Sequence, residues 1–192
     1  DFITAGTGLD AFAHCVEAYS SPHYHPMSQG IALEGMRLVI DNLPRAFTAG
    51  DDLVARANMM SAAMMGATAF QKGLGAIHAI SHPIGAVYNT HHGTTNAVCM
   101  PAVLALNAPE IRTRFNRATP YLGIEGGFDG FCAFVQEFND SFAIPRRLGE
   151  MGVGADRIDT LVDMALADPS CSGNPVKLSK ANLRPILEAL IG

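Results

Sequence analysis

Apolar side chains recur at steps of three and four residues along much of this chain, which is the spacing of amphipathic helices. The clearest case lies between Gly30 and Phe47, where an apolar series and a charged series occupy two different faces. The apolar series is Leu33, Met36, Ile40 and Leu43, and the charged series is Glu34, Arg37, Asp41 and Arg45. The pattern predicts a helix here, with Pro26 suited to its first turn.

Three further helices are predicted from similar evidence. The run over residues 53–70 follows two aspartates that suit a helix N-terminus, and Arg56 is its only charge, so we expect a helix that is buried on most sides. Another helix is marked by Ile158, Leu161, Val162 and Ala165, and a terminal one by Leu183, Leu187 and Leu190. Ser179 opens the terminal helix, and Pro185 is expected to kink or delay it.

Glycine-rich and polar turns separate the predicted helices. They lie at residues 73–75, 88–93, 123–130, 149–154 and 168–177, and they leave room for about eight or nine helices. No segment is predicted to be a strand, and no repeat or change of composition marks a linker. We therefore predict an all-α fold with one domain over residues 1–192.

The composition argues against several classes of protein. Only 16% of the residues are charged and the formal net charge is -5, whereas a nucleic-acid-binding protein would carry a basic patch. No apolar run approaches the roughly 20 residues of a membrane span. We therefore expect neither nucleic acid nor a membrane as a partner. The 4 cysteines form no CxxC pair, which indicates free thiols in a reducing cytoplasm.

Two features indicate that something else accompanies this chain. It begins at Asp1 without a methionine or a signal peptide, so we expect it to be part of a longer protein. The low charge and the positive mean hydropathy suggest that another domain or subunit covers part of the apolar surface.

The candidate chemistry lies in pairs of residues with the four-residue spacing that places side chains on one face of a helix. The pairs are Asp10 with His14 and His78 with His82, and two adjacent histidines, His91 and His92, follow. One carboxylate and several imidazoles suit a divalent ion such as Fe(II) or Zn(II), with a position left for a substrate oxygen. The alternative is a helical interaction module without catalytic activity, in which the histidines only form hydrogen bonds.

Three motifs resemble the iron-containing (group III) alcohol dehydrogenases, and the match covers essentially the whole chain. The motifs are TGLDAFAHCVEAY, GLGAIHAISHPIGAVYNTHHGTTNAVCMP and DPSCSGNP. In that family they belong to the C-terminal, all-helical domain of the dehydroquinate synthase-like/iron alcohol dehydrogenase fold. The resemblance implies that the N-terminal, Rossmann-like domain, which holds most of the nucleotide-binding residues, lies outside this chain.

The resemblance also implies roles for particular residues. The metal ligands would be Asp10, His14, His78 and His92. His92 is preferred to His91 because the family's ligand directly precedes the glycine that opens the next helix. His82 would be a catalytic residue that helps to move the hydroxyl proton, and a neutral imidazole is suited to that role. The alternative for His82 is a structural hydrogen bond at the kink of Pro83.

The resemblance also implies two residues of a substrate pocket. Phe70 and Cys171 match pocket residues of the family, although both could be plain core residues. AFQKGLG is one residue shorter than the family's usual form, and Ser172 and Val176 stand where the family often has Thr and Arg. Outside the motifs, His23 and His25 offer either an accessory metal site or a solvated loop.

The function implied is that of the metal-binding catalytic half of an NAD(P)-dependent alcohol dehydrogenase or aldehyde reductase. The cofactors would be Fe(II), with Zn(II) as the alternative, and NAD or NADP. The partners would be a small alcohol or aldehyde, the N-terminal nucleotide-binding domain and further copies of the parent enzyme in a homo-oligomer. The isolated chain is expected to be inactive. The alternatives are a zinc polyol dehydrogenase, a dehydroquinate synthase-like enzyme, or the non-catalytic module.

Overall fold

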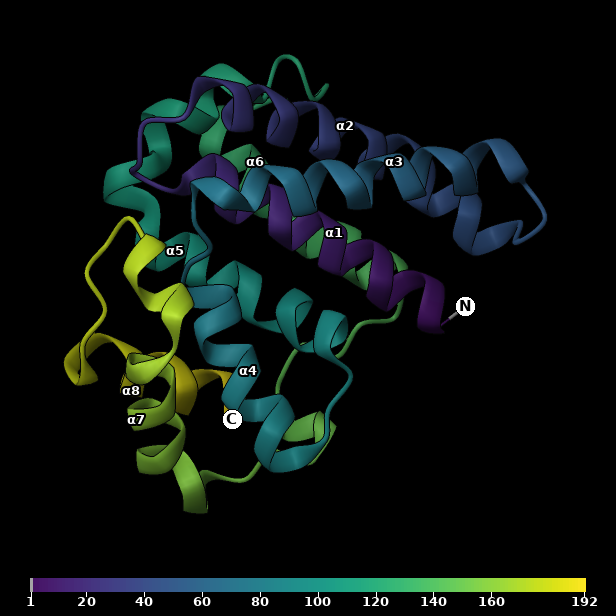
Figure 1. Cartoon of the computed structure of the whole chain (residues 1–192). Coiled ribbons are helices and arrows are strands. Elements are labelled where there is room, and N and C mark those ends of the chain that lie inside the picture. Colours follow the sequence, from purple (N-terminus) through teal and green to yellow (C-terminus); the bar gives the residue numbers. More distant parts are fainter. Residues whose placement is uncertain (1) are drawn as a thin grey trace.

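The computed structural model describes residues 2–192, and every regular element in this range is helical, as Figure 1 shows. The α-helices are α1 (Phe2–Ser20), α2 (Pro26–Thr48), α3 (Leu53–Ala69), α4 (Ala76–Tyr88), α5 (His92–Ala118), α6 (Gly127–Ser141), α7 (Ile158–Ala167) and α8 (Lys180–Ile191). Short 3-10 helices are η1 (Phe70–Lys72), η2 (Gly149–Met151), η3 (Ala155–Arg157) and η4 (Pro169–Gly173). The prediction of an all-α fold is confirmed.

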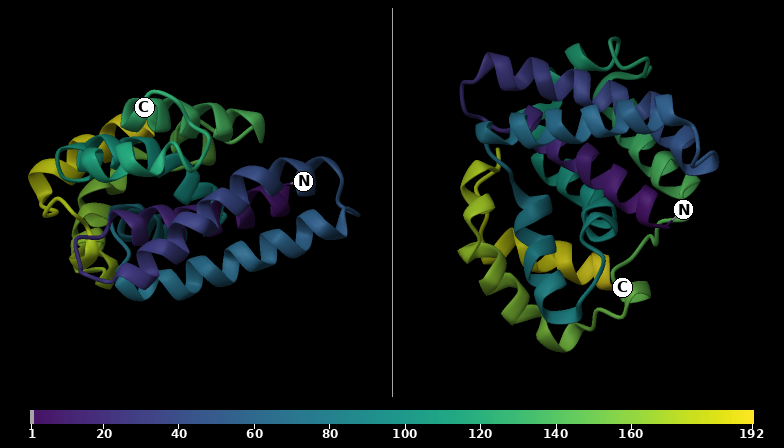
Figure 2. Two further views of the ribbon diagram at one scale, coloured as in Figure 1. Left: turned by 90° about the horizontal axis from the view of Figure 1, so that it is seen from above. Right: turned by 45° about the vertical axis from the view of Figure 1, so that its right-hand side comes forward.

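The helices form two groups that α5 connects. In Figure 1, α1, α2 and α3 lie in the upper part of the molecule with α6 behind them, and α4, α7 and α8 form the lower part. Helix α5 contacts α1 and α6 in the first group and α4 and α8 in the second. Both views of Figure 2 keep α2 and α3 side by side, in agreement with their extensive contact. The connection from η1 to α4 passes from the upper group to the lower one.

Helix α1 is the central helix of the upper group. It packs against α2, α3 and α5, and most of its side chains are buried. Two cations hold its C-terminal end: Lys72 Nζ donates to the carbonyl oxygen of Ser21 (2.6 Å), and Arg114 Nη1 donates to that of Tyr19 (2.7 Å). Such cations satisfy the last carbonyls of a helix and oppose the negative end of its dipole. These hydrogen bonds therefore fix the C-terminal end of α1 against η1 and α5.

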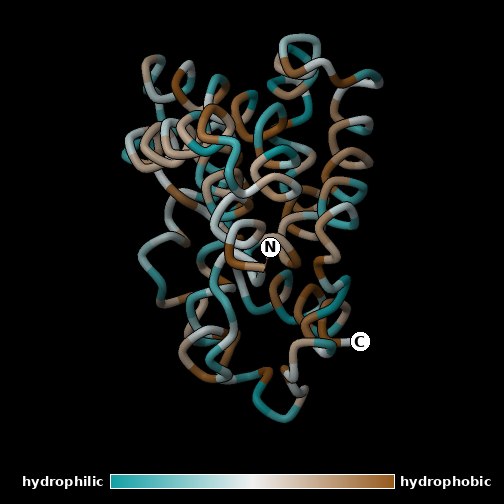
Figure 3. Tube along the Cα trace, turned by 90° about the vertical axis from the view of Figure 1, so that its right-hand side faces the viewer, coloured by the Kyte–Doolittle hydropathy of each residue, from teal (hydrophilic) through white to brown (hydrophobic). Residues whose placement is uncertain are grey.

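Helix α3 is less buried than the sequence predicts. Its buried positions are all small, namely Ala55, Ala62, Gly66 and Ala69, and they face α1 and α2. Its exposed large apolar side chains are Leu53, Val54, Met60 and Met64. The expectation of burial on most sides is wrong because a lack of charge does not by itself bury a helix. Figure 3 likewise shows hydrophobic positions on several sides of the molecule and not only at its centre.

Other boundaries differ from prediction by a few residues. Helix α8 begins at Lys180 with Ser179 as its N-cap, so Pro185 does not delay it. Helix α6 begins at Gly127, inside the segment predicted to be a turn over residues 123–130.

No helix in the described range is long and apolar enough to cross a membrane.

Candidate metal centre

Two predicted ligands project from the middle of α1, and a third approaches at a close contact between helices. Asp10 and His14 lie one helical turn apart and so share one face. A Cβ atom on Gly93, at the start of α5, would collide with the carbonyl oxygen of Gly6, so only glycine permits this approach of α5 to α1. His92 is thereby brought to Asp10, with 3.3 Å between its Nε2 and Asp10 Oδ1.

The fourth predicted ligand, His78, lies in the first turn of α4. The chain reaches α4 through a glycine turn in which Gly73 has a φ of 124°. His78 is only 1% exposed, and its Nδ1 lies 2.6 Å from Oε2 of Glu17. The hydrogen bond with Glu17 raises the pKa of His78, as a bond donated by Nδ1 to a carboxylate does, so we assign a proton to Nδ1. Nε2 faces the other ligands.

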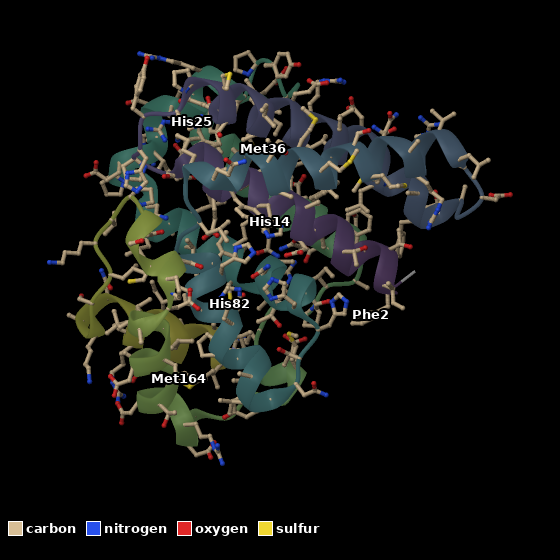
Figure 4. The ribbon with its side chains drawn as sticks, in the orientation of Figure 1. Phe2, His14, His25, Met36, His82 and Met164 are labelled. Carbon is tan, nitrogen blue, oxygen red and sulfur yellow. The ribbon has the colours of Figure 1, made fainter. Side chains whose placement is uncertain are left out.

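The four side chains converge on one region. Nε2 of His78 lies 3.7 Å from Asp10 Oδ1, and Nδ1 of His14 lies 3.9 Å from Asp10 Oδ2. Ligand atoms of these three residues lie within 4.8 Å of one another. Atoms bound to one ion at about 2.1 Å lie within about 4.2 Å of one another, so small side-chain movements would complete the set. Figure 4 shows His14 and His82 near the centre of the molecule, where these helices meet.

A buried amide marks the point of convergence. Nδ2 of Asn96 donates to Asp10 Oδ1 (2.7 Å) and lies 3.1 Å from Nε2 of His92 and 3.2 Å from Nε2 of His78. Among the residues that the structure describes, Oδ1 of Asn96 has no hydrogen-bond partner. One carboxylate oxygen and two imidazole nitrogens therefore surround one small region beside an unpartnered oxygen. One carboxylate oxygen and three imidazole nitrogens also form a donor set that suits Fe(II) or Zn(II), so the residues present fit a divalent ion.

The electrostatics of the cluster keep its carboxylate charged. Burial alone would raise the pKa of Asp10, but hydrogen bonds with His78 and His92 outweigh it and hold the pKa well below its usual range. Burial lowers the pKa of His14. Burial alone would also lower the pKa of His78, but hydrogen bonds with Asp10 and Glu17 raise it to about 9. Asp10 is therefore an anion throughout the neutral pH range, as a cation site requires.

His82 lies at the solvent-facing side of the same cluster. Its ring stacks on that of His92 with 5.4 Å between the centroids, and its side chain is 43% exposed. Its Nδ1 lies 2.8 Å from Oδ2 of Asp168, whose other oxygen accepts from the backbone N of Ser170 (2.8 Å). Burial alone would raise the pKa of Asp168, but the hydrogen bond with His82 lowers it. The bond leaves Nε2 of His82 free.

The two predicted pocket residues lie at different distances from the cluster. Phe70 packs on His14 with 5.3 Å between the ring centroids and is 37% exposed. Cys171 lies in η4, a partly buried segment that contacts α4. The contact that ties this segment to the cluster is made by Asp168. Phe70 thus adjoins the ligands directly, whereas Cys171 remains a prediction.

The histidines outside the predicted set have local roles. His91 is the N-cap of α5, and its Nδ1 accepts from the backbone N of Thr94. His25 caps α2 in the same way through Ser28. His23 is exposed, as a solvated loop residue would be.

Three residues that the sequence did not single out also belong to the cluster. Glu17 lies seven residues after Asp10, and Asn96 lies four residues after His92, so helical spacing could have indicated both. Asp168 opens the DPSCSGNP motif, but its partner, His82, lies 86 positions away in the sequence, so helical spacing could not have paired them.

The sequence of this all-helical domain matches the model of a known protein family. The family model for the C-terminal region of the Fe-containing alcohol dehydrogenases matches residues 4–191. The chain therefore belongs to this family, which confirms the resemblance seen in its motifs.

Individual relatives agree with this assignment. The chain is 41% identical to the 4-hydroxybutyrate dehydrogenase of Cupriavidus necator, over 97% of this chain and 51% of that protein. It is 35% identical to the NAD-dependent methanol dehydrogenase of Bacillus methanolicus, over 90% of this chain and 48% of that protein. A crystal structure of a 1,3-propanediol oxidoreductase superimposes with a TM-score of 0.92 at 30% identity, over 97% of this chain and 51% of that one. The chain spans about half the length of these relatives.

Proposed function

We propose that this chain is the metal-binding catalytic half of an NAD(P)-dependent alcohol dehydrogenase or aldehyde reductase. The observation that carries the proposal is the convergence of Asp10, His14, His78 and His92 on one region. The family assignment and the names of the relatives supply the reaction class. Residues 1–192 would act together with a nucleotide-binding domain that lies outside this chain.

The chemistry that a divalent ion supplies in such a site is Lewis-acid polarisation of an alcohol or carbonyl oxygen during hydride transfer to or from a nicotinamide. Asp10 would supply the negative charge that offsets part of the ion's charge, and the three imidazoles would bind as neutral ligands. Fe(II) is the proposed ion in view of the family, with Zn(II) as the alternative, because nitrogen-rich sites generally bind Zn(II) more tightly.

His82 would move the hydroxyl proton. Asp168 holds its Nδ1 proton, so Nε2 is the atom that can accept a proton from an alcohol or return one to a carbonyl product. Within residues 2–192 this side chain is 43% exposed. The role requires no contact between His82 and the ion.

The substrate would be a small alcohol or aldehyde. The named relatives act on 4-hydroxybutyrate and methanol, whose common reacting group is a primary alcohol. Phe70 would form one wall of the pocket beside His14, and Cys171 would contribute from η4. We further propose a cytoplasmic homo-oligomer that uses NAD or NADP.

The test is the metal content of the full-length protein after anaerobic purification, compared with that of His78→Ala. We expect about one iron or zinc per chain in the wild type and loss of metal in the variant, because the substitution removes one of the four proposed ligands. The matched control is His23→Ala, an exposed histidine outside the cluster, which should retain its metal. A wild-type protein that binds neither ion when supplied with it would disprove the proposal.

A further inference from the structure

Glu17 is a buried carboxylate that connects α1 to the start of α4. It is 4% exposed. Its Oε1 accepts from the backbone N of Ile77 (2.6 Å), and its Oε2 accepts from Nδ1 of His78 (2.6 Å). Both oxygens of one carboxylate thus bind two consecutive residues of α4, and the second of these residues is a proposed metal ligand.

We propose that Glu17 is a positioning residue of the metal centre, which keeps the proton of His78 on Nδ1 and so directs the lone pair of Nε2 at the ion. The inference rests on the proposed metal centre. It assigns to Glu17 a role in metal binding although its own oxygens do not face the other ligands. Residues that hydrogen-bond a metal-binding histidine in this way determine its tautomer and ring orientation.

The orientation of Glu17 follows from the needs of the α4 N-terminus. The first N–H groups of a helix have no partner within the helix, and Gly75, the N-cap of α4, has no side chain to offer. Asn174 Oδ1 accepts from the backbone N of Ala76 (3.0 Å), and Glu17 Oε1 serves Ile77. The positive end of the helix dipole further favours a carboxylate here. Oε1 is therefore committed to Ile77, and only Oε2 can face His78.

This commitment makes Glu17→Gln a selective test. The glutamine has nearly the same shape, and its carbonyl oxygen must stay with the N–H of Ile77, since an amide NH₂ there would place two donors against each other. Its NH₂ group then donates to Nδ1 of His78. A neutral imidazole that accepts at Nδ1 carries its proton on Nε2, the atom that the ion needs. The substitution thus removes a ligand lone pair without removing a ligand.

The experiment measures Co(II) binding to the full-length protein by competition with a chromophoric chelator, together with the visible spectrum of bound Co(II). We expect Glu17→Gln to bind Co(II) roughly 10- to 100-fold more weakly than the wild type. Any Co(II) that it binds should show an altered spectrum, because one imidazole has left the ion. Asn174 is the other residue whose side chain accepts from a backbone N–H at the start of α4, and it makes no hydrogen bond with His78. The matched control is therefore Asn174→Ala. It should lower the melting temperature and leave Co(II) affinity unchanged.

Three outcomes would overturn the inference. The first is a folded Glu17→Gln protein whose Co(II) affinity is within about twofold of the wild type, well short of the expected loss. The second is an equal loss of affinity in Asn174→Ala, since the effect would then come from the α4 terminus. The third concerns the wild type alone: with Zn(II) bound and ¹⁵N-labelled histidine, Nδ1 of His78 should be the protonated nitrogen, and the reverse assignment would refute the role of Glu17. Failure of the wild type to bind Co(II) or Zn(II) would instead remove the metal centre itself.

Discussion

Two carboxylate–imidazole pairs flank the candidate metal centre, and they differ chiefly in their access to water. Oε2 of Glu17 lies 2.6 Å from Nδ1 of His78, and both side chains are almost fully buried. Oδ2 of Asp168 lies 2.8 Å from Nδ1 of His82, and the side chain of His82 is 43% exposed. In each pair the second carboxylate oxygen accepts from a backbone N–H at the start of a helical segment.

The difference in burial suits the two pairs to different tasks. A buried pair cannot exchange its proton readily or rotate, so it keeps one lone pair pointing at one place. An exposed pair keeps its tautomer while its free nitrogen can exchange protons with solvent. The same arrangement of groups can therefore serve metal binding on the buried side and proton transfer on the exposed side. Variants of each pair should separate metal content from turnover.

The largest expected effect is on turnover when His82 is replaced by alanine. General acid–base catalysis typically contributes about 10²- to 10⁴-fold, so kcat of the full-length enzyme should fall by that factor. The metal content should stay at the wild-type level, because His82 is not a proposed ligand. The measurement is steady-state alcohol oxidation together with elemental analysis of the same samples. Unchanged kcat would show that His82 has only a structural role.

A smaller effect, and one on metal binding, is expected from Asp10→Asn. The variant removes the only proposed anionic ligand, and its amide cannot offset the charge of a dication. Metal affinity should fall by more than the roughly 10- to 100-fold typical for loss of a group that only hydrogen-bonds a ligand. Asp41→Asn, on the exposed face of α2, is the matched control. Equal metal affinity of the Asp10→Asn variant and the wild type would exclude Asp10 as a ligand.

Most of the fold could be predicted from local sequence. The helical spacing between Gly30 and Phe47 gave α2, and Ser179 marked the start of α8. The burial of α3 could not be predicted in this way, because it depends on which helices pack beside it. The fully buried residues of α3 are all small, whereas Asn58 and Met59 are half-buried and Met60 and Met64 are exposed.

Local sequence likewise predicts some residues of the candidate site and not others. The pairs Asp10–His14 and His78–His82 follow from spacing within single helices, and the structure places both pairs in one cluster. Glu17 lies seven residues after Asp10 on the same helix, but the sequence alone does not show that its carboxylate meets His78 of α4. Asp168 opens the DPSCSGNP motif, but spacing could not pair it with His82, because the two residues lie in segments that are distant in sequence.

The smallest expected effect is on kcat in Asp168→Asn. This variant tests whether the exposed pair, Asp168 and His82, serves proton transfer and not metal binding. As with Glu17, an amide in place of the carboxylate can donate to the imidazole Nδ1, which shifts the proton of neutral His82 to Nε2 and blocks proton acceptance there. His82 is partly solvated, however, so its ring can turn to water and regain the useful tautomer. We therefore expect kcat to fall by only about 10-fold, below the full contribution of a general base, with KM and metal content unchanged. Asp163→Asn, on α7, is the control. If Asp168→Asn lost its metal as Glu17→Gln is expected to do, the pair at Asp168 would belong to the metal site, and the division of tasks by burial would be wrong.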